Sequence, residues 1–188
     1  MHLNRRYVQL ELLRMYLKTG GKYADRELHL LSELLNILDG KIVEVSRLIS
    51  KSLDPESDGL ADRGEYFIGV GFSVIQQYLT DTLTLTRVRK QSAFDVGPRY
   101  SEEFTFISVV NAAANWWKHS AEWVGQETTN KLALQTQRIV VETADSLDYP
   151  LSNVLAKLLS TSDVSLSALL QNLVLWRSAV DIERAKNA

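Results

Sequence analysis

The chain has 188 residues, of which 45% are hydrophobic and 23% charged, and its formal net charge at pH 7 is −2. These values are those of a globular protein with a packed core rather than of a disordered chain, and we expect one domain over residues 1–188. The absence of cysteine excludes disulfides, thiolate zinc sites and a cysteine nucleophile. No run of about 18 apolar residues could span a bilayer, and charged residues interrupt any signal-like start, so we expect a cytoplasmic location.

The near-neutral charge argues against bulk electrostatic binding to nucleic acid, which needs a clustered positive surface. The basic residues are nevertheless uneven. Two groups stand out, one near the N-terminus and one in the middle of the chain: Arg5, Arg6, Arg14, Lys18, Lys22 and Arg87, Arg89, Lys90, Arg99. They are typical of solvated helix faces that aid solubility, and a phosphate-binding surface is the alternative.

Two helices are predicted in the first quarter of the chain. Apolar residues at spacings of three and four predict a helix over 3–18, ended by Gly20 and Gly21. A longer apolar seam follows, and it predicts one helix over 25–52 that packs against another helix. This seam consists of Leu28, Leu31, Leu35, Leu38, Ile42, Val45 and Ile49. It keeps its phase across Asp39-Gly40, a pair that otherwise signals a turn, so the helix should continue through it.

The third helix is predicted over 64–90, after a loop at 53–63. Its two adjoining apolar faces indicate a central position in the fold. Three glycines, at positions 64, 69 and 71, weaken its helix propensity, and close approach of a neighbouring helix is their expected purpose. Residues 82–86 alternate with the period of a strand, but no second strand is available to pair with them, so a helix is predicted there as well.

The second half of the chain predicts four more helices. A loop at 91–100 is followed by Ser101, a candidate N-cap for a helix that runs to Val124. A fifth helix covers 128–145, and Pro150 suits the first turn of a sixth that ends near 160. The last helix should start after Asp163 or Ser165. The expected fold class is therefore all-α, a bundle of about six to seven helices.

Most signatures of catalysis and of metal binding are missing. The sequence has no glycine-rich phosphate loop, paired-histidine zinc helix, calcium loop or nucleophile elbow. A di-iron bundle needs a carboxylate three residues before a histidine, but Arg26 precedes His29 and Trp116 precedes His119. We therefore predict no metal and no cofactor.

One polar stripe is the candidate site. At 100° per residue, a helix places Asn111, Asn115, Lys118 and Glu122 on one face, with His119 at its edge. The opposite side of the helix carries the large indole of Trp116 or Trp123, and Trp117 flanks it. The candidate binding residues, Asn111, Asn115, Trp116, Lys118 and Glu122, could hold a phosphate or a base edge. His119, Lys118 and Asn115 are the candidate catalytic residues, because histidine exchanges protons near neutral pH.

A structural interpretation of the same residues is the alternative. Asn111 and Asn115 would be buried and would hydrogen-bond to a neighbouring helix, fixing its register. Lys118 and Glu122 would form an ordinary i,i+4 ion pair, and His119 would interact with the end of its helix. The tryptophans would then be anchors of the core or of an interface.

The segment Ala114-Asn115-Trp116-Trp117-Lys118-His119 resembles the signature of HEPN domains, which are helical bundles of prokaryotic toxins, antiviral systems and RNA-processing proteins. That signature is an arginine, often followed by asparagine, then three residues and a histidine. Asn115 and His119 match it, whereas Ala114 stands in place of the arginine. In catalytic members, the resemblance implies, the arginine and histidine of two protomers meet across a dimer interface and cleave RNA through its 2′-hydroxyl without a metal.

Three functions follow from these observations. The first is a non-catalytic HEPN-like module that binds RNA or a protein, in a defence or toxin–antitoxin type of system. The second is a metal-independent endoribonuclease that uses His119 and Lys118. The third is a structural assembly subunit without a small-molecule site. The long seam and the dense tryptophans at 116–123 predict a homodimer, because large aromatic residues are favoured at the centres of interfaces.

Overall fold

The computed structural model describes residues 18–19, 22–23, 25–123, 130–160 and 164–186. Within these ranges the chain forms seven α-helices, one 3-10 turn and a pair of two-residue antiparallel strands. The elements are β1 (Lys18–Thr19), β2 (Lys22–Tyr23), α2 (Arg26–Ile49), α3 (Leu60–Thr86), α4 (Lys90–Phe94), α5 (Phe106–Trp123), α6 (Lys131–Ala144), α7 (Pro150–Leu159), η1 (Ser167–Leu169) and α8 (Leu170–Lys186). The prediction of an all-α bundle of six to seven helices is confirmed.

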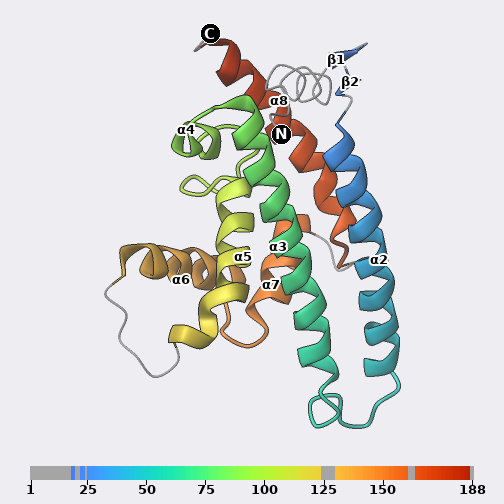
Figure 1. Cartoon of the computed structure of the whole chain (residues 1–188). Helices are drawn as coiled ribbons and strands as arrows, with labels where there is room; N and C mark the ends of the chain where they lie inside the picture. The colour runs from blue at the N-terminus through green and yellow to red at the C-terminus, as the bar shows by residue number, and fades with distance from the viewer. Residues whose placement is uncertain (1–17, 20–21, 24, 124–129, 161–163, 187–188) are drawn as a thin grey trace, which may run out of the picture.

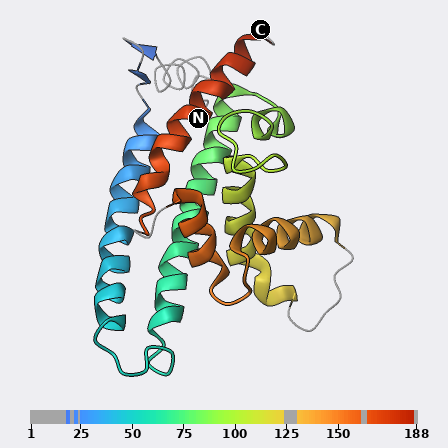
Figure 2. The same cartoon turned by 180° about the vertical axis from the view of Figure 1, so that it is seen from behind.

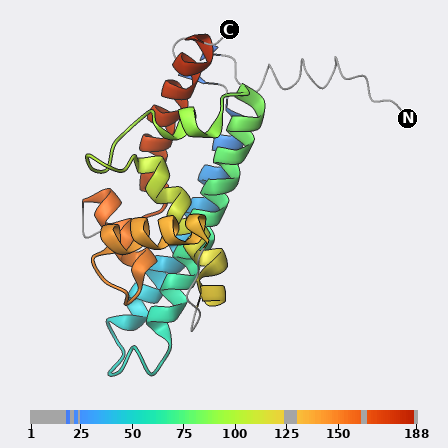
Figure 3. The same cartoon turned by 90° about the vertical axis from the view of Figure 1, so that its left-hand side faces the viewer.

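Helix α3 is the centre of the bundle. It packs against α2 on one side and α5 on the other, and α6 lies across α5 (Figure 1). Seen from behind, α7 and α8 lie over α3 and α5 (Figure 2). The side view shows α6 crosswise to the long axis of α3 (Figure 3). The core therefore lies along both flanks of α3.

Helix α2 is one continuous helix, as its apolar seam predicted. Asp25 caps it, since its Oδ1 accepts a hydrogen bond from the backbone N of Leu28 at 2.9 Å. The helix passes through Asp39-Gly40 without a break. The Asp39 carboxylate points to another element, where it accepts from the backbone N of Leu166 at 2.6 Å and of Ser167 at 3.1 Å. Asp39 thus caps the turn that leads into α8 instead of making a turn of its own.

Two of the three glycines of α3 allow close approach of a neighbour, and at Gly69 that neighbour is a helix, as predicted. A Cβ added to Gly69 would lie 2.3 Å from Cε3 of Trp117, and one added to Gly71 would lie 2.4 Å from Cδ1 of Leu166. Gly64 has only ordinary contact, with Cγ1 of Val45 at 3.6 Å. Residues 82–86 are helical, as predicted, and the helix ends where Arg87 adopts the left-handed region at φ 56°. It begins at Leu60, four residues before the predicted start.

Two predictions in the middle of the chain were wrong. The predicted loop at 91–100 contains the short helix α4, whose residue Ala93 is fully buried. Ser101 is not the N-cap of the next helix, because its Oγ only closes a turn by accepting from the N of Phe104. Thr105 takes that place: its Oγ1 accepts from the N of Ser108 at 3.1 Å, and α5 starts at the next residue.

The remaining helices follow the predictions closely. Asn130 caps α6, and Pro150 occupies the first turn of α7. The register predicted for α8 is buried, including Leu173, Trp176 and Val180. The helix predicted at 3–18 lies outside the described residues except for Lys18, which pairs in β1; the predicted end at Val124 and Gly125 also lies outside them. No helix in the described ranges combines the length and apolarity needed to cross a membrane.

A polar cluster closes one end of the bundle, where α2, α3 and α8 meet. The Tyr78 hydroxyl donates to Oδ2 of Asp25 at 2.6 Å. The Arg177 side chain is 1% exposed, and its Nη1 donates to Oδ1 of Asp181 at 2.7 Å. Burial, reinforced by the Asp25 carboxylate, raises the pKa of Tyr78 far above its ordinary value. The Tyr78–Asp25 bond therefore joins α3 to the N-terminus of α2, and the Arg177–Asp181 pair lies within α8.

Candidate functional site

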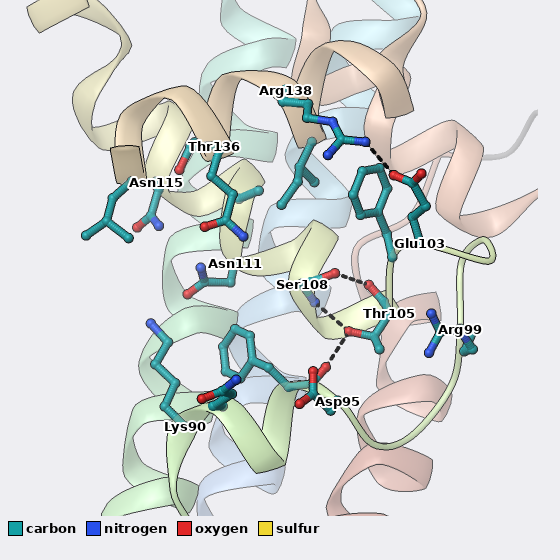
Figure 4. A pocket seen from close by; sticks show the side chains of 17 residues that line it. Lys90, Asp95, Arg99, Glu103, Thr105, Ser108, Asn111, Asn115, Thr136 and Arg138 are labelled. Atoms are coloured by element: carbon teal, nitrogen blue, oxygen red, sulfur yellow. Dashed lines mark hydrogen bonds and ion pairs between the residues drawn. The ribbon is translucent and has the colours of Figure 1, made fainter. Parts of the chain in front are cut away.

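A cleft of about 1010 Å³ opens between α4, the α4–α5 connection, α5 and α6 (Figure 4). This volume is of the size that holds a drug-sized or nucleotide-sized ligand. Its wall combines charged, amide, hydroxyl and aromatic side chains. The polar ones are Lys90, Gln91, Asp95, Arg99, Glu103, Thr105, Ser108, Asn111, Asn115, Gln135, Thr136 and Arg138, and the apolar ones are Phe94, Phe104, Ala112, Leu132 and Ile139. Two residues of the predicted stripe, Asn111 and Asn115, thus line a cavity.

Gln76 of α3 hydrogen-bonds to both asparagines. Its Nε2 donates to Oδ1 of Asn111 and to Oδ1 of Asn115, each at 2.9 Å. Its Oε1 accepts from Nζ of Lys118 at 2.5 Å. Gln76 does not line the cleft. These three bonds join α3 to α5 through one side chain, as the structural interpretation of the stripe expected.

The orientation of this network follows from the chemistry of its members. Lysine can only donate, so Lys118 requires the oxygen of the Gln76 carboxamide on its side. The Gln76 nitrogen then faces α5, and its two N–H groups require the oxygens of Asn111 and Asn115. Within the described part of the chain, the Nδ2 groups of both asparagines have no hydrogen-bond partner. Lys118 therefore orients Gln76, and Gln76 in turn orients both asparagines so that their Nδ2 groups can still donate to a ligand.

The cations of the cleft differ in which protein groups they contact. Arg99 donates to the backbone oxygens of Ser101 and Glu102. Arg138 pairs with Glu103 and, at 2.8 Å, with Glu142, and these two carboxylates raise the pKa of its guanidinium. Nζ of Lys90 lies 5.0 Å from the centroid of the Phe94 ring, a cation–π contact. Arg138 also lies over an aromatic ring of the cleft, since its Cζ is 5.7 Å from the centroid of the Phe104 ring.

The three candidate catalytic residues point in different directions. Nδ1 of His119 lies 3.1 Å from Oε1 of Glu122 on the exposed side of α5. Lys118 is directed to Gln76, and Asn115 lines the cleft. Glu122 is therefore paired with His119 rather than with Lys118. His119 lines neither this cleft nor the second cavity described below.

The tryptophans of α5 are not among the residues that line the cleft. The rings of Trp116 and Trp123 meet edge to face with their centroids 5.8 Å apart. Trp117 packs over Gly69 and meets Tyr66 edge to face at 4.8 Å. Trp116 and Trp117 also line a second cavity of about 540 Å³.

Acidic residues surround this second cavity. Glu65 is engaged, since it accepts from the backbone N of Leu151 at 2.6 Å and of Ser152 at 2.9 Å and so caps α7. Burial raises the pKa of Tyr149, and nearby carboxylates, with Asp62 first among them, add to the effect. In the described part of the chain, no three histidine or acidic side chains converge in a way that could hold a metal ion.

Nothing in the sequence pattern distinguishes Gln76, which lies on another helix, 35 residues before Asn111. Lys90 was visible in the basic group at 87–99, but its place beside the asparagines was not. Comparisons of the chain with protein-family models, with curated proteins and with solved structures found no match.

Proposed function

We propose that this protein is a non-catalytic, cytoplasmic RNA-binding module that holds single-stranded RNA in the cleft between α4, α5 and α6. The observation that carries the proposal is the pair Asn111 and Asn115, which line the cleft together with cations and aromatic rings while their Oδ1 atoms are bound by Gln76. Sequence-specific proteins read unstacked bases by hydrogen bonds and by stacking on aromatic or guanidinium groups. The cleft offers both kinds of group, in Asn111 and Asn115 and in Phe94 and Phe104.

The charges of the region favour an anionic ligand. The cleft wall carries three cations against two carboxylates, Asp95 and Glu103. At its edge, the turn from α3 into α4 adds the exposed Arg87 and Arg89 next to Lys90. Phosphate contacts of this kind contribute affinity without sequence preference.

Binding without cleavage is supported by the position of each motif residue. Ala114 is fully buried, so the position of the family arginine does not reach the cleft. His119 pairs with Glu122 on the exposed side of α5, away from the cleft wall. General acid–base catalysis requires the proton-transfer group within hydrogen-bond reach of the reacting oxygen. An RNA strand in the cleft would lie beside Asn115 and not beside His119.

Fluorescence anisotropy with labelled single-stranded RNA of about ten nucleotides tests this function, because binding sites on single strands span about 4–16 nucleotides. We expect binding that weakens steeply between about 50 and 200 mM salt. Lys90→Gln should weaken it and reduce the salt slope by about 0.7, the value for one phosphate contact on a single strand. The control is Lys157→Gln, at an exposed lysine in the last turn of α7. Absence of binding, or equal weakening by both variants, would contradict the proposal and favour a protein-binding module.

A further inference from the structure

We infer, resting on the proposed function, that the cleft selects uracil, the RNA base with a carbonyl oxygen on each side of its Watson–Crick edge, and that Gln76 sets this preference although it does not line the cleft. Cytosine, guanine and adenine each carry an amino group on that edge. The selection arises because the cleft offers donors from Asn111 and Asn115. Gln76 and Lys118 are positioning residues, since neither lines the cleft.

The first step is the geometry of the donor pair. Asn111 and Asn115 are four residues apart on α5, so they project side by side from one face of that helix. Both are half-buried, and both oxygens are taken by the Nε2 of Gln76 at 2.9 Å. What each carboxamide retains for a ligand is its Nδ2, which can only donate. Two neighbouring donor groups therefore face the ligand, with no acceptor on either carboxamide.

The second step is that the asparagines cannot reverse at low cost. Turning one carboxamide would oppose its Nδ2 to the Nε2 of Gln76, two donors that repel each other and leave both groups unpaired. Turning Gln76 as well would oppose its Nε2 to the ammonium of Lys118, which donates to Oε1 in the structure. All three side chains would have to turn together and lose the lysine bond. The Lys118 bond thus disfavours the reversed arrangement of the three amides.

The third step is discrimination between bases of the same size. Uracil has a carbonyl oxygen on either side of N3, whereas cytosine has one carbonyl and one amino group there, and its N3 accepts where that of uracil donates. The two Nδ2 donors come from residues one helical turn apart, so they match the two separated oxygens of uracil. The amino group would meet the Nδ2 donors of the cleft and lose a hydrogen bond that the uracil oxygen makes. A well-formed base contact contributes about 1–3 kcal/mol of discrimination, so oligouridylate should bind about tenfold more tightly than oligocytidylate.

Gln76→Glu provides the decisive variant, because a carboxylate accepts and never donates. Glu at this position would still pair with Lys118, and it would draw the Nδ2 groups of Asn111 and Asn115 toward itself. Both oxygens would then face the cleft. The preference should invert, so that oligocytidylate binds more tightly than oligouridylate. The added negative charge weakens both complexes, but the ratio of the two dissociation constants cancels that effect.

The experiment measures this ratio by anisotropy for the parent, Gln76→Glu and Lys118→Met, with Lys157→Met as the control and circular dichroism to verify folding. We expect a ratio of about ten in favour of oligouridylate for the parent and control. It should invert in Gln76→Glu and fall toward one in Lys118→Met. Equal binding of the two oligonucleotides by the parent would overturn the inference and leave RNA binding intact, whereas no binding of either would overturn the proposed function and the inference with it. Should Gln76→Glu not fold, an unchanged ratio in Lys118→Met would overturn the role of the positioning residues.

Discussion

The contact between Gly69 and Trp117 offers a direct test of the packing between α3 and α5. An added Cβ at Gly69 would lie 2.3 Å from Cε3 and 2.4 Å from Cδ2 of the indole, far inside van der Waals contact. Gly69→Ala gains about 1 kcal/mol of helix propensity, because alanine restricts the unfolded chain more than glycine does. Overpacking a core costs about 1–3 kcal/mol, and here the indole is also held by Tyr66. The two effects together give a net loss of up to about 2 kcal/mol in the free energy of unfolding.

Gly40→Ala is the matched control for this substitution. Gly40 lies inside α2, is exposed, and has nothing within 4 Å of an added Cβ. It should therefore show only the gain in propensity, about 0.5–1 kcal/mol of added stability. Urea titrations followed by circular dichroism measure both changes, provided that the slope of each transition is unchanged.

Combining Gly69→Ala with Trp117→Leu identifies the clash itself. The smaller side chain should remove much of the penalty of the added methyl group, and a double-mutant cycle measures that coupling. If Gly69→Ala stabilised the protein as Gly40→Ala does, or if the cycle showed no coupling, then α3 and α5 would not approach each other through this pair.

Four further predictions follow from other parts of the molecule. Asp39→Ala should destabilise the fold by about 1–3 kcal/mol in urea titrations, because its carboxylate accepts three hydrogen bonds from residues 165–167. Since the raised pKa of Tyr78 keeps its hydroxyl protonated in the folded state, the unfolding free energy should fall as pH rises above about 10, and this fall should be smaller in Tyr78→Phe. The purified protein should cleave no RNA, and His119→Ala should bind RNA as the parent does; cleavage that the substitution abolishes would instead support the endoribonuclease. Light scattering at micromolar concentration should give twice the 21.3 kDa mass of one chain, and Trp116→Ala should lower it if the indoles form the interface.

The helices of this fold could be predicted wherever a long apolar pattern specifies one. The seam of α2 kept its phase across Asp39-Gly40, and burial of five of its residues is what that phase requires. Helix α4 was missed because five residues are too few for a periodic pattern, and Ala93 is held there by its neighbours. Serine and threonine are both common N-caps, and in the structure Thr105 takes this place, where its Oγ1 also donates to the backbone oxygen of Phe94.

The candidate site could be predicted in part, for a related reason. Helical periodicity placed Asn111 and Asn115 on one face of α5, because residues four apart on a helix are neighbours. Gln76 could not be found in this way, since its contact with Asn111 joins two helices and depends on how they pack. The same limit applies to His119 and Lys118: periodicity gave their angles on the helix, but the bonds to Glu122 and Gln76 determine where each side chain points.

The structural and functional interpretations of the polar stripe are compatible, because the oxygen and the nitrogen of each asparagine carboxamide can have different partners. The oxygens of Asn111 and Asn115 join α5 to α3 through Gln76, which is the role of buried amides in a helical bundle. A side chain that served only this purpose could turn either end toward its partner. Here the partner is itself fixed by Lys118, so the ends that remain are both donors, and they line the cleft. The bonds that hold the two helices together thereby also determine which groups a ligand in the cleft would meet.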